Sequence, residues 1–108
     1  MRAELRRIRD DGGRGAGDAE AALNDGPVGP RLRSAILALA RHRGPDSSTC
    51  PSDAARAVGG EDWRALMDEA REIARELARS GAVEITQRGA VVDPDATWRG
   101  PIRIRTTR

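Results

Sequence analysis

The chain has no lysine, phenylalanine or tyrosine, and its 108 residues include one cysteine, one histidine and two tryptophans. A lone cysteine excludes an intramolecular disulfide. One cysteine and one histidine cannot close a zinc site, which needs about four nitrogen or sulfur ligands. We therefore expect no metal and no other cofactor. Because exposed bases stack on aromatic side chains, the scarcity of aromatics also makes single-stranded DNA and RNA poor partners.

Long apolar runs are missing as well. No stretch approaches the ~20 apolar residues of a membrane-spanning helix. The N-terminal stretch MRAELRRIRDD contains no apolar segment of the kind found in signal peptides. We therefore expect a cytoplasmic protein without membrane contact. The net charge is only +2 although every basic side chain is arginine, so charge permits an anionic partner without requiring one.

The first part of the chain is poor in large apolar side chains and rich in glycine, aspartate and proline. Such a composition cannot bury enough surface to offset the entropy lost on ordering. We therefore predict a disordered tail over residues 1–30 and a folded domain over residues 31–108. Within the tail, a transient helical turn or two is expected only at residues 2–9, which carry Leu5 and Ile8.

Two helices are predicted next. The first begins near Arg31 and is stopped by Gly44 and Pro45, with an apolar face formed by Leu32, Ile36, Leu39 and Ala40. A polar loop with a very short strand follows. Pro51 favours an extended Cys50, Ser52 is a good N-cap, and Gly59 and Gly60 end a short second helix.

The strongest helical pattern is EDWRALMDEAREIARELARSG, in which apolar residues recur every three or four positions. Its apolar stripe opens at Trp63, which we expect to anchor the core. VEIT, QRG and AVVD then predict a β-hairpin, and GPIRIR predicts a further strand. The expected fold class is α+β and mainly helical: a winged helix-turn-helix with a C-terminal hairpin and a short extra strand.

A group of short motifs resembles a known family. They are Cys50-Pro51-Ser52, Ala55-Arg56, Trp63-Arg64 with Met67, Thr86-Gln87 with Gly89, and Arg99-Gly100-Pro101-Ile102-Arg103. Together they are similar to DUF3253, a domain of unknown function, over roughly residues 31–105, about two-thirds of the chain. The resemblance implies a small bacterial winged-helix-like domain and implies no activity.

Cys50 has two interpretations. A cysteine at a helix N-terminus can be activated as a thiolate, with His42 as its base. Alternatively, it is a small hydrophobic residue buried beneath the start of the helix. Nothing in the sequence brings Cys50 and His42 together, so we expect a structural cysteine, no catalytic residue and no enzyme.

Arginines are the candidate binding residues. Arg64, Arg71, Arg75 and Arg79 lie roughly opposite the apolar stripe of the long helix, on the face that enters the major groove in helix-turn-helix proteins. Further candidates are Arg88 at the wing tip and Arg103 and Arg105 on the last strand. They predict weak binding of duplex DNA. The alternative is a protein–protein adaptor, because acidic residues on the same helix form i,i+3 pairs with the arginines and repel phosphate.

Overall fold

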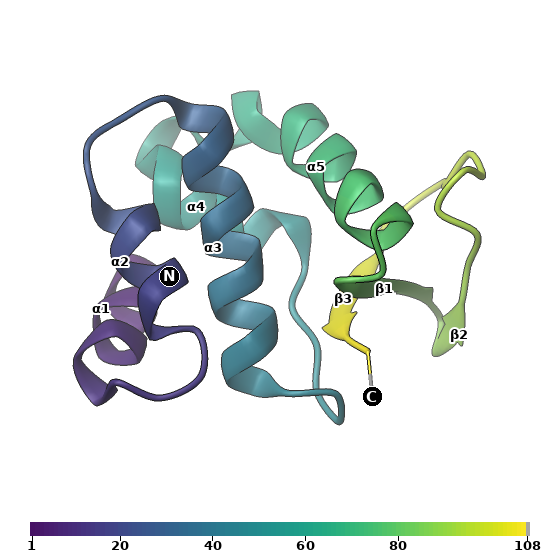
Figure 1. Ribbon diagram of the computed structural model, residues 1–108. Helices are drawn as coiled ribbons and strands as arrows, with labels where there is room; N and C mark the ends of the chain where they lie inside the picture. Colours follow the sequence, from purple (N-terminus) through teal and green to yellow (C-terminus); the bar gives the residue numbers. More distant parts are fainter. Residues whose placement is uncertain (108) are drawn as a thin grey trace.

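The computed structural model describes residues 1–107, which form five α-helices, one 3₁₀ helix and three strands (Figure 1). Their order is α1 (Arg2–Asp11), α2 (Ala16–Leu23), α3 (Val28–Arg43), α4 (Pro51–Gly59), η1 (Gly60–Leu66), α5 (Met67–Arg79), β1 (Val83–Gln87), β2 (Ala90–Val91) and β3 (Arg103–Thr106). The predicted α+β, mainly helical fold class is confirmed. Among the described residues, no helix is long and apolar enough to cross a membrane.

Helix α3 forms the centre of the molecule, with α1 and α2 on one side and α5 and the sheet on the other (Figure 1). Every residue from Ala35 to Ala40 is buried. A helical segment that is apolar on all faces must be covered on all faces, which explains the central position of α3. Ile36 and Leu39 supply large fully buried side chains, and the buried alanines at 35, 38 and 40 let neighbouring helices approach closely.

The sheet is antiparallel, with strand order β2-β1-β3. Arg88 and Gly89 connect β1 to β2 with φ values of 52° and 83°, as a type I′ turn requires. Ile85 pairs with Ile104, and an isolated bridge joins Thr49 to Ile104 on the other edge of β3. This bridge is the very short strand expected before α4. The return strand of the hairpin is shorter than predicted, and residues 92–102, here called the wing loop, connect it to β3.

The predicted long helix begins later than expected. Residues 60–66 form a 3₁₀ helix, interrupted by non-helical backbone at Asp62, and the α-helix starts only at Met67. A 3₁₀ helix has three residues per turn, so it rotates Trp63 out of the apolar stripe that continues in α5. Trp63 is half-buried and lies outside the core cluster, which contains Trp98 instead. The expectation that Trp63 anchors the core is therefore wrong.

The predicted disordered tail at residues 1–30 also requires correction, because α1 and α2 pack on α3. Leu5 and Ile8 are fully buried, as are two alanines of α2. A Cβ at Gly15, which has a φ of 82°, would lie 2.7 Å from the carbonyl oxygen of Ala38. Glycine and alanine thus allow a close approach between α2 and α3, which a search for large apolar residues does not detect.

Candidate nucleic-acid interface

Three of the arginines predicted to contact DNA lie on α5, and their side chains instead contact the wing loop of the same chain. The Arg71 guanidinium donates hydrogen bonds to the carbonyl oxygens of Trp98 and Gly100, each at 3.2 Å. Arg75 donates to the carbonyl oxygens of residues 94 and 96, and Arg79 forms an ion pair with Asp95. These side chains fasten the wing loop to α5.

Trp98 also takes part in the contact between α5 and the wing loop. Its ring centroid lies 4.1 Å from the Arg75 guanidinium carbon, and its indole N–H donates to the carbonyl oxygen of Asp93 at 3.0 Å. Only 8% of Trp98 is exposed. Arg71, Arg75 and Trp98, here called the wing clamp, therefore join the wing loop to α5.

The solvent-facing side of α5 is acidic. Its exposed residues include Asp68, Glu69, Glu72 and Glu76. Among the described residues, Glu72 alone of these four receives hydrogen bonds from a neighbouring arginine, with 3.1 Å separating its Oε1 from Arg75 Nε. A helix face with acids outward and arginines turned towards the wing loop repels phosphate, so it opposes entry of the middle of α5 into a DNA groove.

Both predicted arginines of β3 also have partners within the domain. Arg103 donates to the hydroxyl and the carbonyl oxygen of Ser48, at 2.8 and 2.9 Å. Arg105 pairs with Glu84, its neighbour across the strands, at 3.0 Å. They connect β3 to its neighbours and have little freedom to reach an external phosphate.

Arg64 and Arg88 differ from the other five candidates, because within residues 1–107 the side chain of neither forms a hydrogen bond or an ion pair. Both are exposed. Arg64 lies over the Trp63 ring, 4.5 Å from its centroid, and Arg56 of α4 lies over the same ring at 4.4 Å. Arg56 was not predicted as a site residue, because it and Trp63 become neighbours only when the turn between α4 and η1 forms.

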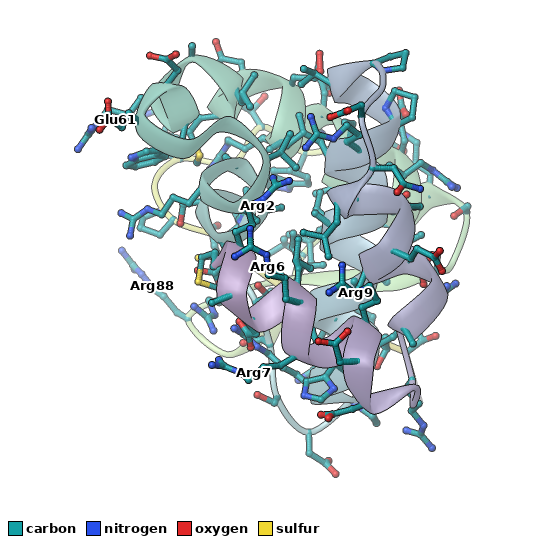
Figure 2. The ribbon with its side chains drawn as sticks, turned by 90° about the vertical axis from the view of Figure 1, so that its left-hand side faces the viewer. Arg2, Arg6, Arg7, Arg9, Glu61 and Arg88 are labelled. Atoms are coloured by element: carbon teal, nitrogen blue, oxygen red, sulfur yellow. The ribbon has the colours of Figure 1, made fainter. Side chains whose placement is uncertain are left out.

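Helix α1 adds basic side chains that the prediction of a disordered tail left out. Figure 2 shows Arg2, Arg6, Arg7 and Arg9 along α1, on the face turned towards the viewer. Arg2 donates to the carbonyl oxygen of Ala57 at 3.3 Å, which ties α1 to the end of α4. Arg6 and Arg7 are exposed, and the described residues offer them no hydrogen-bond partner. These two arginines therefore add positive charge to this face, whereas Arg9 is paired with Asp10 at 2.9 Å.

A half-buried polar cluster lies where α1, α3 and α4 meet. Arg43 donates to both Glu4 carboxylate oxygens, at 2.9 and 3.1 Å, and to Asp53 Oδ2 at 3.2 Å. The hydroxyl of fully buried Thr49 donates to the same Asp53 oxygen at 2.7 Å. Burial opposes ionisation of Asp53, but hydrogen bonds from Thr49 and Cys50, with the charge of Arg43, lower the pKa of this carboxyl below its ordinary value.

This lowered pKa predicts how stability depends on pH. The ionised Asp53 is favoured by folding, so its contribution is complete above the unfolded-state pKa, ordinarily 3.8, and is lost as pH falls through the lower folded-state value. We expect Asp53→Asn, which keeps an oxygen acceptor, to flatten the acid limb of the stability curve. Urea unfolding midpoints of both proteins between about pH 7 and pH 3 measure this. Parallel curves would contradict it.

Cys50 is the N-cap of α4, in place of the predicted Ser52. Its backbone N–H donates to Asp53 Oδ2 at 3.3 Å, and its thiol shares a hydrogen bond with the Ser52 hydroxyl at 2.9 Å. Cys50 is half-buried rather than mostly buried, because the cap position lies at the surface end of the helix. His42 is exposed in the last turn of α3, and no hydrogen bond among the described residues joins it to Cys50.

A helix, a bridging residue, a second helix, a short 3₁₀ helix, a third α-helix and a β-hairpin define a domain of the winged-helix class. The chain belongs to the family described as protein of unknown function DUF3253, which matches residues 30–107. This confirms the resemblance found in the sequence motifs. Helices α1 and α2 lie outside the matched segment. No curated protein matches the chain.

Proposed function

We propose that the protein is a non-enzymatic, cytoplasmic binding module of bacteria that contacts duplex DNA weakly. The observation that carries this proposal is the placement of Arg64 and Arg88, the two predicted arginines whose side chains form no hydrogen bond or ion pair with the described residues. Glu61, on the same short helix as Arg64, and Arg88 project from one edge of the molecule in Figure 2. The 3₁₀ helix between α4 and α5 and the wing tip thus lie on a common side in this view.

The contact is with the sugar–phosphate backbone. Arg88 and Arg99 line a cleft of about 420 Å³ on the wing, together with Gln87, Val92 and Thr97. These cations suit phosphate, whereas the acidic outer face of α5 repels phosphate and opposes entry into a groove. Backbone contacts position a protein on DNA without distinguishing sequences, and they weaken steeply with salt. Weak, salt-dependent and sequence-tolerant binding follows from this arrangement.

The test is titration of a labelled duplex at low salt with the Arg64→Glu/Arg88→Glu double variant. Each lost phosphate contact should lower the slope of log affinity against log salt by about 0.9. Both residues are exposed, so the circular dichroism spectrum should not change. Arg14→Glu is the matched control, because Arg14 is also an exposed arginine. Its neighbour Gly15 approaches Ala38 in the second half of α3, which places Arg14 beside α3 and not in η1 or the hairpin.

Equal binding by wild type and double variant, or an equal loss in the Arg14→Glu control, would contradict the proposed contact. If the wild type does not bind duplex DNA at all, the DNA proposal fails. The second candidate, a protein–protein adaptor, then leads. The observation that favours it is the exposed acidic face of α5, whose carboxylates are suited to a basic partner surface.

A further inference from the structure

Two guanidinium groups share a single indole ring at the turn between α4 and α5. The guanidinium carbons of Arg56 and Arg64 lie 4.4 and 4.5 Å from the ring centroid of Trp63. Both arginines are exposed, and within residues 1–107 neither guanidinium group donates a hydrogen bond to the protein. The wing clamp differs, because there Arg71 and Arg75 lie over Trp98 but also donate to carbonyl oxygens. At Trp63, the N–H groups of both guanidinium groups remain available to a ligand.

Stacking on an aromatic ring orients a guanidinium without using its N–H groups. Tryptophan is the best side chain for this interaction. The planar fork of arginine matches the oxygens of phosphate in a bidentate geometry, and an arginine that is already oriented loses less side-chain freedom on binding. Two like charges held beside one ring repel each other, and an anion bound by both relieves that repulsion. The arrangement is therefore suited to an anion with several oxygens.

The surroundings add charges of both signs. Arg2 reaches the carbonyl oxygen of Ala57, the residue after Arg56, so α1 brings a further cation to this surface. In Figure 2, Arg2 and Arg6 lie on the same face of the molecule. Glu61 and Asp62, just before Trp63, are exposed and oppose an anion, although neither is hydrogen-bonded to Arg56 or Arg64. Figure 2 shows Glu61 projecting outward from the turn.

We propose that Arg56 and Arg64, held by Trp63, form a phosphate-binding site. If the phosphate belongs to a DNA backbone, this inference rests on the proposed function, and α4 becomes part of the surface that contacts DNA. The same chemistry also accepts a free polyphosphate. The site joins α4 to η1, so it forms only when the helix-turn-helix is folded.

The experiment measures two ligands separately, a short labelled duplex and inorganic pyrophosphate, at low salt. Arg56→Ala should weaken binding about tenfold, since a charge-assisted contact is lost. Arg56→Lys keeps the charge but loses the planar fork, so it should recover only part of the affinity. Trp63→Leu leaves both arginines unanchored and should also weaken binding. Arg14→Ala, again the matched control, should bind as the wild type does. Circular dichroism of each variant establishes that it is folded.

The two ligands distinguish the sources of the phosphate. Loss of both duplex and pyrophosphate binding in Arg56→Ala supports a general phosphate site, and loss of duplex binding alone supports a backbone site. If only pyrophosphate binds, and binding depends on Arg56, the site is supported while the DNA proposal fails. If neither ligand binds the wild type, or if Arg56→Ala and Trp63→Leu bind normally, the site is overturned. Where the wild type binds duplex and the Arg56 and Trp63 variants bind normally, duplex binding that depends on Arg88 would preserve the proposed function.

Discussion

Replacing Trp98 with alanine is expected to lower the free energy of unfolding by about 3–5 kcal/mol, the usual cost of removing a large buried aromatic side chain. Trp98 is almost fully buried, donates a hydrogen bond to the Asp93 carbonyl and stacks with Arg75. A small domain has only about 5–15 kcal/mol of stability, so the variant should be close to unfolding. Urea denaturation followed by circular dichroism measures the change.

Trp63→Ala is the comparison, because it removes the same side chain from a half-buried position outside the core. We expect it to cost only about 1–2 kcal/mol, mainly two exposed cation–π contacts of about 0.5–1 kcal/mol each. A larger cost at Trp63 than at Trp98 would contradict the placement of both side chains.

Leu5→Ala is expected to destabilise the protein by about 2–5 kcal/mol, the range found for truncation of a buried leucine. Leu5 is fully buried although it lies outside the segment matched by the family. Removal of α1 by proteolysis should likewise lower the melting temperature, because Leu5 and Ile8 leave the core. Thermal and urea unfolding of the full chain measure both effects.

The control for this prediction is Arg7→Ala on the same helix. Arg7 is exposed and, among the described residues, has no hydrogen-bond partner, so its replacement should change stability by no more than about 0.5 kcal/mol. Equal stability of the Leu5 and Arg7 variants would show that α1 does not pack in solution.

Much of the fold could be predicted because its signals are local. The period of apolar residues defined α3 and α5, and alternation around Arg88 and Gly89 defined the hairpin. The tail could not be predicted, because alanine and glycine stabilise it through close helix contact, as at Gly15, rather than through large side chains. Trp63 was misplaced because periodicity alone does not distinguish a 3₁₀ turn from the start of an α-helix.

The candidate site was predictable only as a set of charges. Spacing placed Arg71, Arg75 and Arg79 on one face of α5, but their partners come from a wing loop that begins more than a dozen residues later along the chain. No periodic pattern encodes the path of such a loop. Arg56 and Trp63 were missed as a pair for the same reason, since their contact depends on the closed turn between α4 and η1.

The hydrogen bonds between α5 and the wing loop have a consequence for how this segment can vary in evolution. Arg71 and Arg75 bind main-chain carbonyl oxygens, which every amino acid provides. Substitutions at exposed positions such as Ala96 and Thr97 therefore leave these bonds in place, whereas an insertion or deletion moves the carbonyl groups out of register with both arginines. The loop is thus constrained in its length and tolerant in its side chains, and lysine, which lacks the planar fork, is a poor substitute for either arginine.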